Sequence, residues 1–166
     1  MVNLKAHRFT VIFASLFVLF AFQKYLYAQE DKKPKFVFWS PILGKPISSH
    51  FGNRKHPITG ELKDHKGVDI AVAHGTWISA AADGKVIFAG NNLRHYGKAV
   101  FIAHKHGYVT HYGHLSHISV YRGQAVNAGQ YIGKSGATGR VTGPHLHFTL
   151  IKNGEYVNPS DYIELE

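Results

Sequence analysis

The stretch Gly143-Pro144-His145-Leu146-His147-Phe148-Thr149-Leu150-Ile151 decides the fold class, because after a Gly-Pro turn its polar and apolar residues alternate. Successive side chains of a β-strand point to opposite faces of the sheet. The apolar side chains of this stretch therefore face a core, and its two histidines share the other face with Thr149. Two adjacent imidazoles on one strand are either a compact pair for metal binding or catalysis, or solvated residues on the polar face of a half-buried strand.

Similar short segments follow one another through most of the chain. From Pro46 onwards, glycine and β-branched residues punctuate apolar runs about every ten residues, which is typical of an all-β sandwich or barrel. Lys105-His106-Gly107 has the composition of a hairpin turn. No amphipathic helix of about ten residues or more is expected after residue 29. The expected strands are residues 76–80, 84–89, 98–104, 108–112, 131–134 and 145–151.

The first 28 residues have the pattern of an export signal. Lys5 and Arg8 make the start basic, residues 11–22 are almost wholly apolar, and Ala28 offers a small residue for cleavage. The apolar run is shorter than the roughly 20 residues that span a bilayer comfortably. The sequence therefore predicts a signal peptide over residues 1–28, with an uncleaved N-terminal membrane anchor as the alternative.

The composition narrows the classes of function. The chain has 19 basic and 10 acidic residues, a formal net charge of +9 and no cysteine. Without cysteine there is no disulfide and no thiolate zinc site, so any metal must be held by imidazole and carboxylate. A basic exported protein suits an anionic polymer or a membrane surface. Nucleic acid is not expected, because no helix-turn-helix, zinc-finger spacing or dense basic stripe is present.

A further histidine precedes a carboxylate that needs a partner. Asp69 is enclosed by apolar neighbours in Val68-Asp69-Ile70-Ala71-Val72, and burying an unpaired carboxylate is costly. His65 lies four residues earlier, so the two side chains share a face if the segment is extended. A metal cation beside His65 would compensate Asp69, and so would a salt bridge to Lys66 or Arg54.

The third histidine segment is Tyr108-Val109-Thr110-His111-Tyr112-Gly113-His114. Strand parity predicts that Tyr112 and His114 share one face and that His111 lies on the other. Only one of these two histidines is therefore expected to join the site, and the residues themselves do not decide which. Together the three segments supply three metal ligands and two further imidazoles, which is the inventory of a hydrolytic zinc centre.

At these residues the chain resembles the LytM/lysostaphin-type zinc metallopeptidases of peptidase family M23, which are peptidoglycan endopeptidases. The resemblance runs from about Pro46 to Tyr162. The segments that carry it, in family order, are Phe51-Gly52-Asn53-Arg54, His65-Lys66-Gly67-Val68-Asp69, Tyr112-Gly113-His114-Leu115-Ser116, Gly133-Lys134-Ser135-Gly136, Gly143-Pro144-His145-Leu146-His147-Phe148 and Val157-Asn158-Pro159.

The resemblance implies a domain organisation. Residues 46–162 would form a small antiparallel β-sheet or sandwich core of the LytM type, the duplicated hybrid motif, with a groove flanked by loops. An N-terminal signal or anchor helix over residues 1–28 and a linker over residues 29–45 would precede this domain. Residues 163–166 would form a C-terminal tail.

The resemblance also implies roles for the site residues. His65, Asp69 and His147 would bind one Zn²⁺ per chain, and His114 and His145 would be the catalytic pair. A catalytic zinc has three protein ligands and keeps its fourth position for water, whose pKa it lowers. Which of the two catalytic histidines is the general base is left open.

Further residues are expected in or around the groove. The family segment selects His114 rather than His111. Tyr112 and Arg54 are candidate auxiliary residues, with a packing role for Tyr112 as the first expectation. The turn-rich, polar stretches Gly90–Gly97 and Gly136–Gly143 are expected to form the groove walls.

The predicted function is a zinc-dependent endopeptidase that hydrolyses peptide cross-links of bacterial peptidoglycan through a zinc-activated water. It would act in the periplasm or cell envelope, or be secreted. Peptidoglycan is the expected partner, membrane contact is expected only if the N-terminal segment stays uncleaved, and no obligate protein partner is expected. One alternative is a non-catalytic LytM-type wall-binding or activator module, and another is a His-rich periplasmic metal-binding protein that binds several ions per chain.

Overall fold

The computed structural model describes residues 36–55, 60, 62–93 and 95–164, together with the isolated positions Val18, Phe22 and Lys24. The predicted signal or anchor segment lies almost wholly outside the described residues. Among the residues that are described, no helix combines the length and the apolar character needed to cross a membrane. Contacts divide the chain into two units, Met1–Phe36 and Val37–Glu166, and every strand among the described residues lies in the second.

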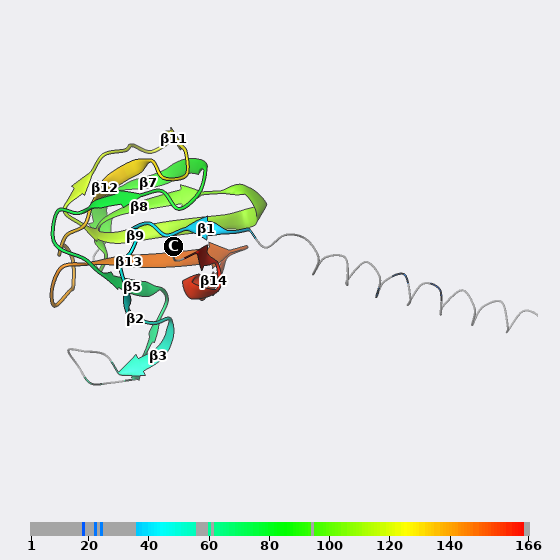
Figure 1. Ribbon diagram of the computed structural model, residues 1–166, viewed down its shortest axis with the longest axis horizontal. Helices are drawn as coiled ribbons and strands as arrows, with labels where there is room; N and C mark the ends of the chain where they lie inside the picture. The colour runs from blue at the N-terminus through cyan, green and yellow to red at the C-terminus, as the bar shows by residue number, and fades with distance from the viewer. Residues whose placement is uncertain are drawn as a thin grey trace, which may run out of the picture. The chain divides into compact units, whose positions relative to one another are not determined.

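An antiparallel eight-stranded sheet forms the centre of the second unit (Figure 1), in the order β11-β7-β8-β9-β13-β5-β2, with β14 paired to β13. Adjacent strands are antiparallel throughout this sheet. The strands are β2 (Ile47–Ser49), β5 (Val68–Ala71), β7 (Gly84–Leu93), β8 (Gly97–Ala103), β9 (Tyr108–Leu115), β11 (Ala125–Val126), β13 (His145–Lys152) and β14 (Glu155–Val157).

Smaller sheets accompany the large one. A three-stranded sheet has the order β10-β12-β6, β3 and β4 form a hairpin, and β1 pairs with β15 in parallel. Their bounds are β1 (Phe38–Trp39), β3 (Gly52–Lys55), β4 (Leu62–His65), β6 (Trp77–Ser79), β10 (His117–Ile118), β12 (Tyr131–Lys134) and β15 (Ile163–Glu164). Two short 3₁₀ helices, η1 (Lys105–Gly107) and η2 (Pro159–Asp161), complete the described fold. The predicted all-β, mostly antiparallel fold class is confirmed.

Alternation of side chains explains why these segments become strands. Leu146, Phe148 and Leu150 of β13 are fully buried, as the pattern predicts. Ile78 and Ile132 of the three-stranded sheet are equally buried, so both sheets contribute apolar faces to the core. Removing this apolar surface from water is the main driving force that holds the sheets together.

All six predicted strands are present, and two of them continue for three or four residues beyond their predicted ends. β7 continues through a glycine- and asparagine-containing stretch to Leu93, and β9 continues to Leu115. The pairing of β7 with β8 shifts register between Val86 and Phe88 and again between Gly90 and Leu93. These bulges let β7 stay paired where its alternation is lost.

Both edges of the expected domain carry additional structure. Residues 37–45, assigned from the sequence to a linker, contain β1 and belong to the compact second unit. Phe38 is fully buried, and its ring meets those of His104 and Tyr108 edge-on, each at 5.4 Å between centroids. Phe38 pairs with Ile163, so the two ends of this unit are fastened together by β1 and β15.

Candidate functional site

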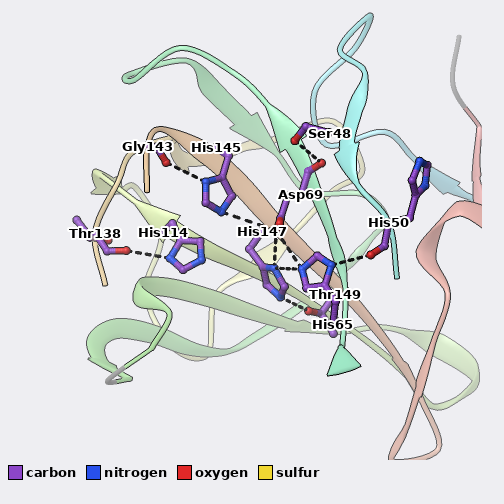
Figure 2. Close-up of polar contacts among 10 residues, drawn as sticks. All are labelled: Ser48, His50, His65, Asp69, His114, Thr138, Gly143, His145, His147 and Thr149. Atoms are coloured by element: carbon purple, nitrogen blue, oxygen red, sulfur yellow. Dashed lines mark hydrogen bonds and ion pairs between the residues drawn. The ribbon is translucent and has the colours of Figure 1, made fainter. Parts of the chain in front are cut away.

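Three polar side chains converge on one point of the large sheet (Figure 2). Asp69 of β5 lies opposite His147 of β13 in the strand register, and His65 is the last residue of β4. Asp69 Oδ1 lies 2.9 Å from His147 Nδ1 and 3.2 Å from His65 Nε2. His65 Nε2 and His147 Nδ1 are themselves 3.2 Å apart. All three residues are buried.

His65 and Asp69 do not lie on one extended strand, which is the arrangement that the sequence analysis considered for them. β4 ends at His65 and β5 begins at Val68, so the backbone leaves the strand conformation between them. The two side chains nevertheless converge, because β5 pairs with β13 while the β3–β4 hairpin holds His65 beside them. In addition, His65 Nδ1 donates to the carbonyl oxygen of His50 at 2.8 Å.

The donor set fits a zinc ion. A carbonyl oxygen only accepts, so the proton of neutral His65 lies on Nδ1 and its Nε2 lone pair faces Asp69 and His147. Nitrogen and oxygen lone pairs this close repel each other unless a proton or a cation lies among them. The three candidate ligand atoms lie within 4.8 Å of one another. Imidazole nitrogen and carboxylate oxygen are zinc ligands in cysteine-free sites.

The protonation states of the cluster also suit a metal. Burial alone would raise the pKa of Asp69, but the hydrogen bond that His147 Nδ1 can donate to it outweighs burial and holds that pKa well below its usual value. Burial lowers the pKa of His147. At neutral pH the carboxyl group is therefore charged and the imidazole neutral, as metal binding requires.

Two further histidines lie beside the cluster. His145 Nε2 is 3.7 Å from Asp69 Oδ1, and the His114 and His145 rings meet edge-on at 4.8 Å between centroids. The Nδ1 atom of each donates to a carbonyl oxygen at 2.9 Å, that of Thr138 for His114 and that of Gly143 for His145. Each neutral ring therefore keeps its Nε2 lone pair as a proton acceptor. Burial lowers the pKa of His114 to about 4, so it is neutral at pH 7.

The predicted facing of Tyr112 and His114 is wrong. Tyr112 lies opposite Phe148 in the strand register and is fully buried, with its hydroxyl accepting the N–H of Ala81 at 2.8 Å. Its role is in the core. His114 has φ +61°, a left-handed conformation that breaks the alternation of β9. This single backbone angle turns His114 towards His145.

His111 consequently lies on the face of the sheet that carries His147, yet it does not line the groove. Its ring stacks on Phe101 at 4.2 Å and meets Tyr96 edge-on at 4.4 Å. Its Nε2 atom has no hydrogen-bond partner among the residues that the structure describes. Burial holds the pKa of His111 well below its usual value. His111 is therefore a neutral residue packed behind the site.

The site opens into a groove of about 600 Å³. Its walls include His95 and Tyr96 on one loop and residues 140–144 on another. Each loop overlaps one of the two stretches expected from the sequence, but residues 90–93 of the first stretch belong to β7. The two loops are locked together, because the Arg140 N–H donates to the His95 carbonyl at 3.0 Å. A Cβ on Gly139 would lie 2.6 Å from the backbone nitrogen of Gly97, so only glycine allows this approach.

The sequence analysis did not single out two residues that line the groove, Tyr96 and Arg140. The Tyr96 ring lies 5.4 Å from the His147 ring and 6.4 Å from the His114 ring, and Arg140 lines the groove with an exposed side chain. Only the turn-rich composition of their loops pointed to them. The side chain of Arg54 lies outside the described part of the chain, although its backbone belongs to β3.

An antiparallel β-sheet that carries a buried His-Asp-His cluster, flanked by two more histidines in a groove, defines a metallopeptidase-like site. The chain belongs to peptidase family M23, whose sequence profile matches residues 63–159. That match contains all five site residues, His65, Asp69, His114, His145 and His147.

Known proteins resemble this chain over the same domain. Peptidoglycan DD-endopeptidase ShyC of Vibrio cholerae is 43% identical over 135 residues, covering 80% of this chain and 31% of ShyC. Murein hydrolase activator NlpD of Salmonella dublin is 42% identical over 99 residues, covering 60% of this chain and 26% of NlpD. The crystal structure of a zinc containing peptidase from Vibrio cholerae superimposes with a TM-score of 0.69 and 38% identity, covering 76% of this chain and 40% of that one. This chain thus spans a third or less of the length of these curated relatives.

Proposed function

We propose that the protein is a zinc-dependent endopeptidase that hydrolyses peptide cross-links of bacterial peptidoglycan. The observation that carries the proposal is the convergence of His65, Asp69 and His147, with the Nε2 atoms of His114 and His145 left as proton acceptors beside them. The names of the relatives support it, since ShyC is a peptidoglycan DD-endopeptidase and the similar crystal structure is that of a zinc containing peptidase.

Zinc would be held by His65 Nε2, Asp69 Oδ1 and His147 Nδ1. A zinc ion in such a site lowers the pKa of a bound water and polarises the carbonyl of the scissile bond. The protein contributes ligands that are already assembled and largely shielded from water.

His114 and His145 are proposed to move the protons. Hydrogen bonds from Nδ1 to backbone carbonyls fix the ring orientations and keep each Nε2 as the acceptor. A neutral imidazole of this pair takes a proton from the attacking water, and the resulting imidazolium gives a proton to the leaving amine. While protonated, it also stabilises negative charge that develops on the carbonyl oxygen.

The proposed place of action is the periplasm or cell envelope. Two observations support it: the export-type pattern of residues 1–28 and the peptidoglycan-directed names of the relatives. The basic net charge of +9 suits an anionic wall polymer.

The experiment is digestion of purified peptidoglycan by the full-length chain, with and without a zinc chelator, with the products identified by mass spectrometry. The zinc-loaded protein is expected to release peptide-cleaved fragments, and the chelator should stop their release. His65→Ala should lose zinc and activity together, whereas His114→Ala should keep zinc and lose activity by about 10²–10⁴-fold. Failure of the zinc-loaded protein to cleave any wall chemotype would overturn the proposal.

A second candidate function is activation of another wall hydrolase, favoured by the similarity to murein hydrolase activator NlpD. An activator needs the groove surface but neither zinc nor the catalytic pair. Stimulation of a partner hydrolase that survives both His65→Ala and His114→Ala, without cleavage by the chain alone, would support this candidate. A metal-storage protein would instead bind several ions per chain, which elemental analysis of the purified protein would reveal.

A further inference from the structure

The four histidines of the site are oriented in two different ways. Three of them donate from Nδ1 to a backbone carbonyl oxygen, which can only accept a hydrogen bond. His147 instead directs Nδ1 at Asp69, and its Nε2 lies 3.0 Å from the hydroxyl of Thr149. The carbonyl-bound pairs are His65 with His50, His114 with Thr138 and His145 with Gly143.

Thr149 and His147 are in contact because both belong to β13. The two residues lie two apart on the strand and therefore share a face, as Figure 2 shows. Thr149 is 1% exposed and His147 is 5% exposed, so water has little access to the contact. A buried imidazole N–H needs an acceptor, and Thr149 Oγ1 is within hydrogen-bond distance.

Gly67 leaves the space in which this contact forms. A Cβ on Gly67 would lie 2.7 Å from Thr149 Oγ1, 2.9 Å from His147 Nε2 and 2.5 Å from the carbonyl oxygen of Phe148. Any side chain at position 67 would therefore displace the hydroxyl, the ring or the strand. This gives a physical reason for glycine between the two ligands His65 and Asp69.

A hydroxyl group can either donate or accept a hydrogen bond, whereas a carbonyl oxygen can only accept one. When His147 Nδ1 offers its lone pair to a cation, the ring proton lies on Nε2 and Thr149 Oγ1 accepts it. When Nδ1 carries the proton and donates to Asp69, the hydroxyl can rotate and donate to Nε2. Thr149 thus satisfies both tautomers of His147.

We propose that Thr149 is a positioning residue for the metal centre, whose hydroxyl holds the His147 ring with Nδ1 directed at the metal. The inference rests on the zinc site of the proposed function. Loss of the outer hydrogen-bond partner of a metal-binding histidine typically weakens metal affinity by about 10–100-fold. For His147, a side chain supplies this partner, so a point mutation can test it.

The test compares zinc affinity of the full-length wild type, Thr149→Val and Thr149→Ser, by competition with a chromophoric chelator. Valine keeps the branched shape and lacks the hydroxyl, so it is expected to bind zinc about 10–100-fold more weakly. Serine restores the hydroxyl and should recover most of the affinity. The matched control is Thr110→Val, because the buried Thr110 hydroxyl contacts His104 Nε2 at 2.7 Å, a histidine outside the zinc cluster. This control should leave zinc affinity unchanged.

A second readout is the tautomer of His147, from ¹⁵N chemical shifts of its ring in the zinc-loaded wild type. The proposal expects a protonated Nε2 and a metal-bound Nδ1, and this measurement decides the matter if Thr149→Val does not fold. Wild-type zinc affinity in a folded Thr149→Val protein, or a protonated Nδ1 in the zinc-loaded wild type, would overturn the role of Thr149 alone. A wild type that binds no zinc would overturn the proposed zinc site together with it.

Discussion

His111 is packed tightly behind the site by Phe101 and Tyr96, although its Nε2 atom has no hydrogen-bond partner among the described residues. Replacing it by phenylalanine keeps a ring in the stack and removes a buried polar atom, which costs about 1–3 kcal/mol when unsatisfied. We expect His111→Phe to raise the free energy of unfolding by about 1 kcal/mol, measured by urea denaturation. A loss of stability would show that the imidazole makes a polar contact that the protein needs.

The same substitution should change the pH dependence of stability. Burial holds the pKa of His111 well below its ordinary value of about 6.5, so the unfolded chain binds the proton more readily than the folded one. The stability that comes from keeping this ring neutral is therefore fully present above about pH 6.5 and is lost as the pH falls below that value. Between pH 7 and pH 5, His111→Phe should lose less stability than the wild type. Equal losses would mean that His111 is not the group that titrates.

At the scale of single residues, the sequence predicts which histidines and which carboxylate lie together better than it predicts their geometry. The alternation of β13 places His145 and His147 on one face, as the structure has them. The same rule fails on β9, because it takes no account of the left-handed φ of His114. That angle depends on contacts with a distant loop, such as the bond from His114 Nδ1 to Thr138, and no local pattern encodes it.

At the scale of elements, the loop of residues 139–144 presents Arg140 to the groove. Its backbone is pinned to His95, and its exposed side chain makes no ion pair among the described residues. Lys66 also lines the groove. The proposed wall-peptide substrate fits these cations where it carries a free carboxylate, which arginine binds in a bidentate manner.

Arg140→Ala is therefore expected to raise KM about tenfold on a carboxylate-bearing peptide, with kcat nearly unchanged, because binding is lost equally in the ground and transition states. Arg140→Lys should recover part of the affinity. A peptide with the carboxylate amidated is the control and should not distinguish wild type from Arg140→Ala. A fall in kcat with unchanged KM would indicate that Arg140 acts on the catalytic geometry instead.

The contribution of the strand pair β1–β15 to stability can be tested through Phe38. Phe38 is fully buried, whereas its neighbour Trp39 is 63% exposed. Phe38→Ala should lower the free energy of unfolding by about 3–5 kcal/mol through loss of burial and creation of a cavity. Trp39→Ala is the matched control and should have little effect in the same denaturation experiment. Equal effects would mean that β1 is not anchored through Phe38.

Sequence patterns reveal the long central strands and miss these short ones. β13 has enough alternating residues to be recognised locally, and its predicted bounds agree closely with the structure. β1 and β15 have two residues each, and they exist because the two ends of the domain pair with one another. Such long-range pairing leaves no local periodicity from which it could be predicted.

For the whole molecule, the site joins parts of the chain that are distant in sequence. Its proposed ligands come from β4, β5 and β13, and the catalytic pair comes from β9 and β13. Because these strands meet only in the folded protein, the unfolded chain has no preformed site, and zinc binding should stabilise the fold by mass action.

Removal of zinc should therefore lower the melting temperature of the entire domain. At a free zinc concentration 100 times Kd, linkage gives about 2.7 kcal/mol of stability, which corresponds to roughly 5–10 °C for a domain of this size. Calorimetry at pH 7 with and without a chelator measures the difference, and His65→Ala, which lacks a ligand, should show none. If chelation removes zinc, as elemental analysis would verify, yet leaves the wild-type melting temperature unchanged at pH 7, then zinc is not bound at a site formed by the fold.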